Sequence, residues 1–456
     1  NIFLTILIAI SVALIIFAPL LVNLVAPGFS PEKKELTVML MRVMFLSPII
    51  LAISSIVTGI LQVFHRFLVG AMAPILYNTG IIIGILFFVP RFGLLGLAFG
   101  VVLGATLHLL IQVPAFLFSG FAYKLQFNFR HPGVVKTLTL MVPRSLGLGA
   151  GQFNTMVTTA IASTLISGSI AIFNLANNLA AMMVHTIAAS LSTAIFPPMA
   201  RAFAAKDIKT FEYKFQGAFS QILFLTIPIS ISLFFLRTQI IRVVLGTGKF
   251  GWQDTRLTAA CLGIFALGLC GQGLIFLLSK TFYAAHNTKI PAWISFGTVV
   301  FNIALSLIFV WLLSFSNVFY SALQSILKLQ NIQNISVVGL ALAFTVTAIC
   351  EALILLFFVY KKLRVFRLTT VLPSIYKIII SGLVMSTVIL LVRDALVNYH
   401  SITLQTTLGV FLQLIIAGAC GLVGYLIASF ALKSPELKMI EESFLRRVGK
   451  RPTIDI

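Results

Sequence analysis

Arg144 is a basic residue inside an apolar stretch, and its chemistry suits the binding of an anion. It follows Pro143 in the stretch Met141–Gly147. An arginine at the centre of a membrane helix costs about 2.5–3.5 kcal/mol on insertion scales, so such residues usually face a cavity or a partner. The guanidinium fork matches phosphate oxygens. The alternative is that the side chain snorkels to the cytoplasmic headgroups.

Polar side chains accompany Arg144 along the same predicted helix. At about 100° per residue, Thr155 lies within about 60° of Arg144, and Gln152 and Asn154 flank this stripe on either side. We therefore predict that Arg144, Gln152, Asn154 and Thr155 line a substrate-binding cavity.

A second polar stripe follows on the next apolar stretch. Asn177, Asn178, His185 and Ser192 all fall within about 60° of Asn174 on a helix of regular pitch. Five polar residues on one face are atypical of a lipid-facing surface. We predict that Asn174, Asn177, Asn178 and His185 line the cavity, and the alternative is hydrogen bonding between helices.

Glu351 is an acidic residue deep within an apolar stretch, which implies an interior position. With Asn302 and Thr345 it forms a candidate site for a coupling cation, Na⁺ or H⁺. The alternative is a structural carboxylate that accepts hydrogen bonds from a polar neighbour. His108 also lies in an apolar stretch, and we expect it to be a core histidine whose ring nitrogens have hydrogen-bond partners within the protein.

Signatures of enzymes are absent from this sequence. The eleven acidic residues are scattered, without an Asp-rich cluster, a zinc-type His pair, a phosphate-binding Gly loop or a nucleophile elbow. The four cysteines lie in apolar stretches without paired or metal-ligand spacing and are predicted to be small core residues. We predict that the protein is not an enzyme and has no cofactor or metal, apart from the candidate coupling cation.

The elements that carry these residues are predicted to be membrane-spanning helices. The sequence is 59% hydrophobic and 9% charged, against about 25% charged residues in a soluble domain. Apolar stretches of about 20 residues, the length that crosses a bilayer, recur along the chain. The expected spans are 4–26, 38–64, 68–89, 94–118, 138–163, 170–195, 219–236, 257–278, 290–313, 337–360, 375–397 and 404–432.

The basic residues indicate the orientation of these spans. With both ends of the chain in the cytoplasm, 21 of the 32 Lys and Arg residues fall on the inside and 10 on the outside. Cytoplasmic loops retain Lys and Arg, so we predict that both ends are cytoplasmic. The net charge of +21 therefore reflects membrane topology, and no nucleic-acid partner is expected.

The first four spans resemble spans seven to ten. Gly70–Pro74 parallels Lys289–Pro291, and Gly96-Leu97-Ala98-Phe99 parallels Gly339-Leu340-Ala341-Leu342. An offset of six spans gives a parallel repeat. We expect an all-α integral membrane fold with two pseudo-symmetric six-helix lobes and two extra helices, fourteen in all. About twelve of these helices lie in this sequence, and the other two are expected before Asn1. The expected domains are residues 1–132, 133–368, 369–432 and a basic tail, 433–456.

Several phrases of the sequence resemble the MurJ/MviN family of lipid II flippases, within the multidrug/oligosaccharidyl-lipid/polysaccharide exporter superfamily. They follow the family's order over nearly the whole chain: Ala26–Ser30, Ala73–Asn78, Phe173–Leu179, Ala194–Ala202, Gly248–Thr255 and Phe282–Pro291.

The resemblance implies fourteen helices in two lobes, with a cationic central cavity for the pyrophosphate and sugars of lipid II. It also implies a groove at the last two spans, 375–432, for the polyprenyl tail. The sequence departs from the family at Asn178, where the family often has arginine, and Arg144 is a candidate substitute for that charge.

The function that follows is alternating-access flipping of lipid II from the inner to the outer leaflet of the bacterial inner membrane. The expected partners are the undecaprenyl-pyrophosphate-linked precursor, membrane lipids and cell-wall synthesis enzymes. The alternatives are export of another polyprenyl-linked glycan, a related multidrug/cation antiporter, or a scaffold that recruits cell-wall enzymes without transport.

Overall fold

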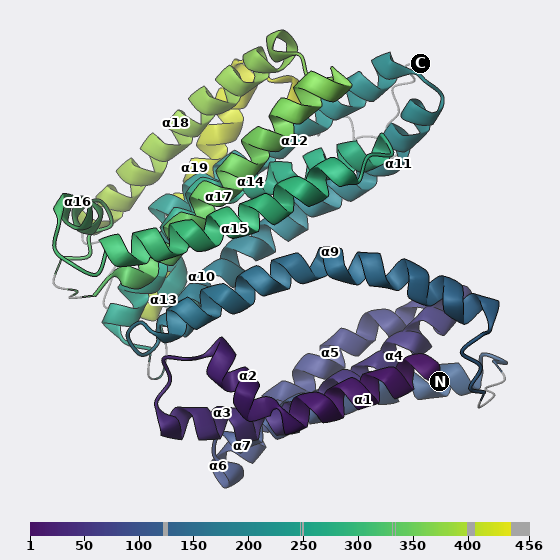
Figure 1. The fold of residues 1–456 in the computed structure, drawn as a ribbon. Coiled ribbons are helices and arrows are strands. Elements are labelled where there is room, and N and C mark those ends of the chain that lie inside the picture. The colour runs from purple at the N-terminus through teal and green to yellow at the C-terminus, as the bar shows by residue number, and fades with distance from the viewer. Residues whose placement is uncertain are drawn as a thin grey trace. The chain divides into compact units, whose positions relative to one another are not determined.

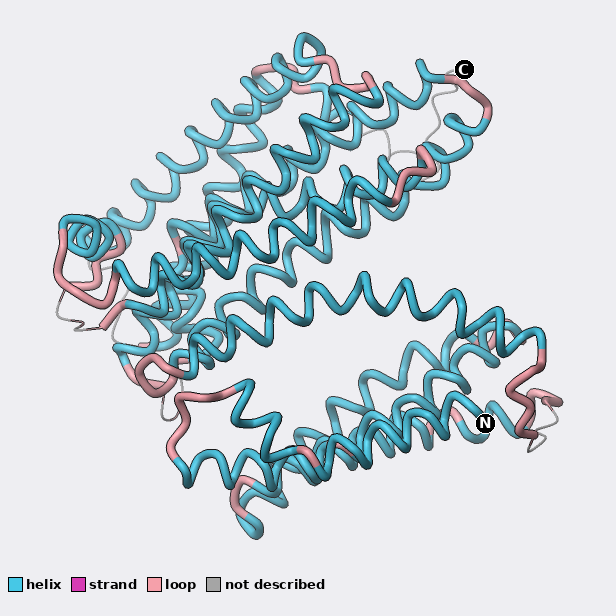
Figure 2. Tube along the Cα trace, viewed as in Figure 1, coloured by secondary structure: helices cyan, strands magenta, loops and turns pink. Residues whose placement is uncertain are grey.

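The chain is helical throughout the part that the structure describes. The computed structural model describes residues 1–121, 126–246, 248, 250–330, 332, 334–398 and 406–438, without the side chains of residues 140, 142–144, 146–148 and 150. Within these ranges the helices are joined by short loops and no strand occurs (Figures 1 and 2). The all-α prediction is confirmed.

The chain folds as two compact units, Asn1–Gly149 and Ala150–Ile456. The helices of the first unit are α1 (Ile2–Ile16), α2 (Ala18–Val25), α3 (Pro31–Met44), α4 (Leu46–Val63), α5 (Phe67–Ile83), η1 (Gly84–Phe88), α6 (Val89–Phe92), α7 (Leu95–Leu110) and α8 (Val113–Leu117). Helix α9 (Pro132–Ser163) contains the boundary between the units.

The second unit continues from α9 with twelve further helical elements in its described part. They are α10 (Ser169–Val184), η2 (His185–Ala189), α11 (Ser190–Ala204), α12 (Ile208–Phe235), α13 (Arg237–Leu245), α14 (Trp252–Ala284), α15 (Lys289–Leu312), α16 (Val318–Ile326), α17 (Ser336–Phe358), η3 (Val359–Leu363), α18 (Leu368–Asn398) and α19 (Thr407–Ala431).

The predicted spans coincide with these helices. Among the described residues, 10 helices are long and apolar enough to cross a membrane, and the pair α1–α2, bent by 72° just before Pro19, makes an eleventh. Helix α9 carries the remaining predicted span. Some helices extend beyond their apolar stretches because a capping side chain sets where they begin. For example, α12 begins where the side chain of Asp207 accepts a hydrogen bond from the backbone of Thr210.

Close backbone contacts hold α5 and η1 against α7 in the first unit. A Cβ atom on Gly80 would stand 2.4 Å from Cα of Gly104, and one on Gly84 would stand 2.4 Å from Cα of Gly100. Small residues let membrane helices approach closely, and dispersion contacts between them replace the hydrophobic effect that lipid cannot supply. The glycines therefore fix this interface.

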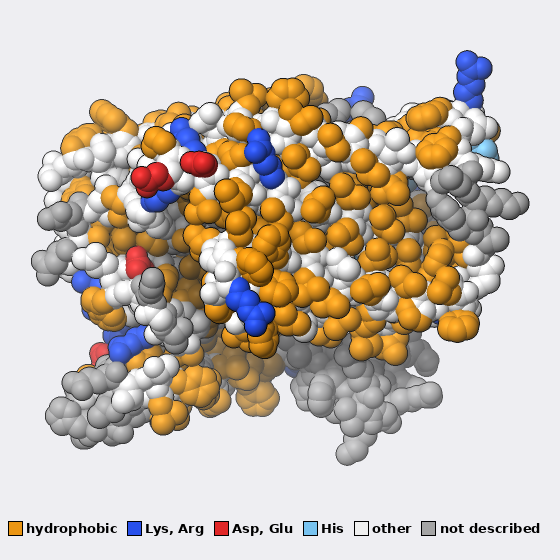
Figure 3. Space-filling view, turned by 90° about the horizontal axis from the view of Figure 1, so that it is seen from below, with side chains coloured by type: hydrophobic (Ala, Val, Ile, Leu, Met, Phe, Trp, Pro, Cys, Tyr) orange, Lys and Arg blue, Asp and Glu red, His pale blue; other side chains and the backbone are white. Residues whose placement is uncertain are grey.

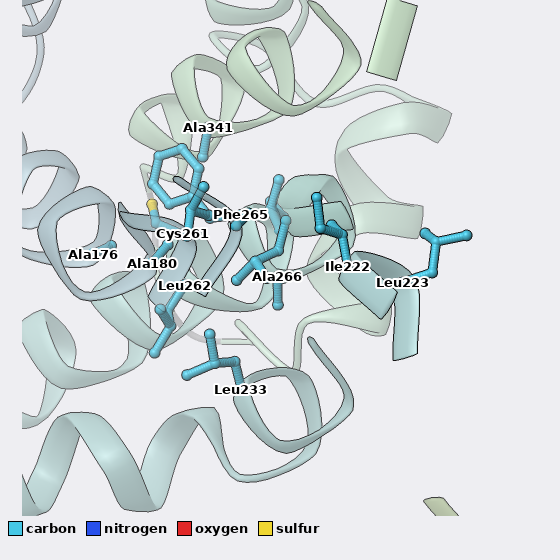
Figure 4. Packing of buried hydrophobic residues seen from close by; sticks show 14 of the residues in the cluster. Ala176, Ala180, Ile222, Leu223, Leu233, Cys261, Leu262, Phe265, Ala266 and Ala341 are labelled. Carbon is cyan, nitrogen blue, oxygen red and sulfur yellow. The ribbon is translucent and has the colours of Figure 1, made fainter. Parts of the chain in front are cut away.

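Helix α14 is the centre of the second unit. It packs against α10, α11, α12 and α17. Figure 4 shows alanines of α10 and α17 and aliphatic side chains of α12 gathered around the α14 residues Cys261, Leu262, Phe265 and Ala266. The cysteines are free thiols, as expected, but Cys420 on α19 is exposed, so the prediction that all four are core residues is wrong for Cys420.

Packing inside each unit agrees with the internal repeat. Helix α7 packs against α4 and α5, and α17 packs in the same way against α14 and α15. Gly96 and Gly339, which the repeat pairs, both allow close contact with the backbone of the preceding span. A Cβ atom on Gly96 would stand 2.4 Å from the carbonyl carbon of Phe88 on the preceding span, and one on Gly339 would stand 2.9 Å from that of Phe309.

Apolar side chains cover the outer surface of the spans. Helix α15 exposes Trp293, Phe296, Val300 and Trp311. Figure 3 shows one face on which hydrophobic side chains predominate and charged ones are few. Such a surface suits the hydrocarbon core of a bilayer rather than water.

The last two helices pack within the second unit. Helices α18 and α19 lie against each other, and α18 also packs on α12 (Figure 1). The hydroxyl of Tyr425 on α19 donates to the carbonyl oxygen of Phe224 on α12 at 2.9 Å. The structure thus joins the expected segment 369–432 to the unit that begins at Ala150, while most of the basic tail lies outside the described residues.

Candidate functional site

The candidate site lies on the continuous span formed by α10, η2 and α11. The helix changes at His185–Ala189 to a π-helical turn, which closes hydrogen bonds over five residues instead of four. Helix α14 accommodates this turn at Gly273, where a Cβ atom would stand 3.1 Å from that of the buried Ala188. Single π-helical turns within α-helices occur frequently at functional sites.

A shallow pocket opens beside the π-helical turn. Its volume is about 430 Å³, and its lining is formed by His185, Ala189, Ser190, Thr193 and Ala194. His185 and Thr193 are exposed. The pocket therefore presents an imidazole and two hydroxyl groups within a membrane span.

Helix α14 adds a cation beside this pocket. The Lys280 Nζ atom donates to the Thr193 Oγ1 atom at 2.6 Å. One turn earlier, the ring of Phe276 packs edge-on against the ring of His185 with 5.4 Å between centroids. No carboxylate among the described residues forms an ion pair with Lys280. An ammonium group near the end of a spanning helix, without an acidic partner among the described residues, suits an anionic ligand.

The π-helical turn corrects one part of the predicted stripe. Ser192 is fully buried, although regular helical pitch places it with Asn174 and His185. A π-helical turn holds one extra residue, so the residues after it are rotated by about 100° from the regular register. Thr193 therefore occupies the position that regular pitch predicts for Ser192.

The three asparagines of α10 lie in the same span. Asn174 and Asn177 are half-buried, and Asn178 is exposed. The described residues include no hydrogen-bond partner for their side-chain amides. Interhelical hydrogen bonding, the alternative interpretation of this stripe, occurs among the described residues at Thr193, which accepts from Lys280, but not at the asparagines, and cavity lining stays a prediction.

The stripe on α9 is only partly described. The side chain of Arg144 lies outside the described residues. Gln152 and Thr155 are exposed, whereas Asn154 is half-buried and its Oδ1 atom has no hydrogen-bond partner in the described part of the chain. Because this oxygen is also inaccessible, a ligand could donate a hydrogen bond to it only after a change of conformation.

The residues predicted to bind a coupling cation divide between two helix interfaces. Glu351 on α17 accepts hydrogen bonds from Ser295 at 2.7 Å and from Thr298 at 3.2 Å, both on α15. On the same interface, the Asn302 amide donates to the Thr347 hydroxyl at 3.3 Å. Thr345 instead donates to a backbone carbonyl of α14, so it does not share a site with Glu351.

The π-helical turn, Thr193 and Lys280 were not predicted as parts of the site. Lys280 stands near the end of an apolar stretch, where hydropathy assigns it to a loop. Only the structure shows that the helix of the apolar run Leu257–Leu278 continues through Lys280.

Membrane-spanning helices, one of which carries a polar face beside a lysine of its neighbour, define a class, the polytopic membrane proteins. Within this class the chain belongs to the lipid II flippase MurJ family, whose sequence model matches residues 1–411. The resemblance drawn from the sequence motifs is confirmed. Family and spans together place the chain in the bacterial inner membrane as a multi-pass protein.

Similar curated proteins come from several bacteria. The probable lipid II flippase MurJ of Buchnera aphidicola subsp. Acyrthosiphon pisum is 32% identical over 63% of this chain and 57% of its own length. The probable lipid II flippase MurJ of Rhizobium tropici is 31% identical over 67% of this chain and 58% of its own length. The lipid II flippase MurJ of Burkholderia cenocepacia is 27% identical over 60% and 55%. The matches thus span between a half and two thirds of these relatives.

Two solved structures are similar to this chain. A lipid II flippase MurJ in an inward closed conformation matches with a TM-score of 0.73 and 26% identity, over 98% of this chain and 83% of that one. An inward-facing multidrug resistance MATE family transporter of the MOP superfamily matches with a TM-score of 0.63 and 14% identity, over 80% and 79%. The second likeness concerns the fold alone.

Proposed function

We propose that this chain flips lipid II from the inner to the outer leaflet of the membrane by alternating access, and that it catalyses no chemical reaction. Membership of the MurJ family supports this proposal, as does the likeness to a solved lipid II flippase over nearly the whole chain. The polyprenyl tail would stay in the bilayer while the charged headgroup crosses along polar side chains.

The observation that carries the proposal is the polar face of α10, η2 and α11 beside Lys280. Lys280 lies near the end of the candidate spanning helix α14 and donates its hydrogen bond to a neutral hydroxyl rather than to a carboxylate. A single charge attracts an anion several times more strongly in a medium of low dielectric constant than in water. A diphosphate headgroup is therefore a suitable ligand for this face, and a cationic drug is a poor one.

The two polar stripes would share the binding of the headgroup. Arg144 would bind the diphosphate through its fork, and Gln152, Asn154 and Thr155 would bind sugar hydroxyls along α9. Asn174, Asn177, Asn178 and His185 would do the same along α10 and η2. Amides and hydroxyls suit this task because they both donate and accept hydrogen bonds.

A coupling cation, Na⁺ or H⁺, would bind at Glu351. Its carboxylate already accepts two hydroxyl hydrogen bonds, so a cation would complete a site whose oxygens come from α15 and α17. Asn302 lies on the same interface, whereas Thr345 would act only indirectly, through the contact between α17 and α14.

The remaining parts of the proposal concern topology and partners. Both ends of the described chain would lie in the cytoplasm, because the basic residues concentrate in the loops on that side. Helices α18 and α19 would guide the polyprenyl tail, and cell-wall synthesis enzymes would receive the flipped precursor.

The test is translocation of lipid II in proteoliposomes, together with complementation of a bacterial strain depleted of its own lipid II flippase by the gene that encodes this chain. We expect translocation and growth from the wild type, and about tenfold to a hundredfold less translocation from Lys280→Met at equal membrane abundance. Translocation of a different polyprenyl-linked glycan in place of lipid II would favour the first alternative. Transport of cationic drugs alone would favour a multidrug antiporter.

A further inference from the structure

Two arginines approach each other at one end of the second unit. Arg237 is the first residue of α13, directly after the span of α12, and Arg393 lies in the last turns of α18. Their charges are close enough to interact: burial first, and then the positive charge of Arg393, lower the pKa of Arg237. Like charges this close repel each other unless an anion lies nearby.

The fold holds Arg237 in this place from two sides. Its Nη1 atom donates to the carbonyl oxygen of Phe234 at 2.9 Å, and its guanidinium lies 5.1 Å from the centre of the Phe234 ring. On α14, Gly263 leaves room for the side chain, because a Cβ atom there would stand 2.8 Å from Cδ of Arg237. Residues of two helices, α12 and α14, therefore fix the position of the Arg237 guanidinium.

A chain of hydrogen bonds ties α13, α19 and α18 together beside the arginines. The Gln239 amide donates to the Gln413 Oε1 atom at 3.1 Å, and the Gln413 amide donates to the carbonyl oxygen of Arg393 at 3.4 Å. Gln413 is only 1% exposed. The backbones that carry the two cations thus keep a fixed relation to each other.

The acidic residues described near the two arginines do not neutralise both positive charges. Asp394 accepts from the Nε and Nη2 atoms of Arg393, at 3.1 Å and 3.0 Å, through a single oxygen, and Asp394 is 61% exposed. No carboxylate in the described part of the chain pairs with Arg237. As the first residue of α13, Arg237 also stands at the positive end of the helix dipole, where an anion is favoured.

We propose that Arg237 and Arg393 form a binding site for the phosphate group of a membrane lipid, at the end of α12 and α18 where the chain leaves the bilayer. Both arginines lie at the ends of candidate spans, so a bilayer around these spans would bring lipid headgroups near them. Arginine forks bind phosphate oxygens in pairs. The site does not depend on lipid II flipping, and it is separate from the face that carries Lys280.

Two lipids offer this chemistry, an anionic phospholipid and a polyprenyl diphosphate. Native mass spectrometry of the purified protein, titrated separately with phosphatidylglycerol, undecaprenyl diphosphate and a neutral diacylglycerol, distinguishes them. For Arg237→Gln we expect about tenfold weaker binding of one or both phosphate lipids, and no change for diacylglycerol. Arg256→Gln is the matched control, because this arginine donates to a backbone carbonyl of Gln330 and should leave lipid binding unchanged.

A second variant distinguishes loss of the lipid site from loss of binding by misfolding. Asp394→Asn removes the competing negative charge from Arg393 and should strengthen binding of the same lipid severalfold, a gain that a damaged protein would not show. Weakened binding only of phosphatidylglycerol identifies a phospholipid site, and weakened binding only of undecaprenyl diphosphate identifies a site for the polyprenyl lipid. Equal affinities in the wild type, Arg237→Gln and Asp394→Asn would overturn the proposal.

Discussion

Two polar regions of this chain differ in how their side chains find partners. Between α4 and the segment from α7 to the start of α8, four polar residues form a closed network: Ser54, Thr58, His108 and Gln112. A hydrogen bond of 2.7 Å joins Ser54 and His108, and Gln112 donates to Ser54 and accepts from Thr58, each at 2.7 Å. Along α10, η2 and α11, the asparagine amides have no partner among the described residues, and His185 is exposed. A buried polar group must be satisfied, so the closed network stabilises an interface. The open face is free for a ligand.

Glu351 has features of both regions, because it has hydrogen-bond partners but is also a candidate ligand for a cation. It lies twelve residues after Gly339, as His108 lies twelve residues after Gly96, so the two titratable side chains occupy equivalent positions of the repeat. His108 contacts the helix α4, whereas Glu351 contacts α15. Position in the repeat therefore does not decide the role of such a residue. The partners on the neighbouring helix do.

The largest effect is expected at Arg144, the cation of the stripe predicted on α9. Arg144→Ala should abolish lipid II translocation without lowering membrane abundance, and Arg144→Lys should leave partial activity, because lysine keeps the charge but loses the bidentate geometry. The measurement is translocation normalised to inserted protein. Under the snorkelling alternative, Lys would serve as well as Arg. Unchanged normalised transport in Arg144→Ala would remove Arg144 from the open face.

The next effect concerns Lys280. Lys280→Met removes one charge-assisted hydrogen bond to the headgroup, so we expect normalised translocation to fall by about tenfold to a hundredfold. Lys289→Met is the matched control, because Lys289 is an exposed lysine at the start of the next helix. Equal losses in both variants would show that Lys280 contributes general charge and no specific contact.

A smaller effect should separate a coupling carboxylate from a structural one. Glu351→Gln keeps an oxygen that can accept from Ser295 but loses the charge, so we expect a several-fold loss of translocation together with loss of its dependence on Na⁺ or H⁺. Thr345→Val, which alters only the contact with α14, should keep that dependence. If ion dependence persists in Glu351→Gln, Glu351 is a structural carboxylate, comparable to the residues of the closed network.

The smallest effect on transport is expected in the closed network. Gln112→Leu leaves Ser54 and Thr58 without one partner each, which should lower the free energy of unfolding by about 1–2 kcal/mol. Translocation per folded molecule should not change. Gln62→Leu, at an exposed position of α4, should alter neither quantity. A transport defect in Gln112→Leu at full stability would contradict the structural role of the network.

Most of the fold could be predicted from the sequence, because each span has the length and apolar composition that a bilayer demands. The repeat was also readable, since Gly96 and Gly339 must be glycines where backbones touch. Helix ends were less predictable, as at α12, because hydropathy does not detect a helix that continues beyond the membrane.

The site was only partly predictable. The asparagines of α10 and His185 could be found because regular pitch holds from Asn174 to the start of η2. Beyond that point the π-helical turn changes the register, and periodicity cannot anticipate an inserted residue. Lys280 comes from another helix, so only tertiary packing brings it to Thr193.

The distinction between open and closed polar regions is tested most directly by thiol accessibility. In a background with the four native cysteines replaced by serine, single cysteines at Asn178, His185, Gln112 and Met182 would be treated in membranes with a water-soluble thiol reagent. We expect modification at Asn178 and His185, reduced by added lipid II. We expect none at Gln112, inside the closed network, or at Met182, which is 53% exposed and which we expect to face lipid. Protection at Asn178 and His185 equal to that at Gln112 would contradict the account, because it would mean that the polar face of α10 and η2 is closed to water and to substrate.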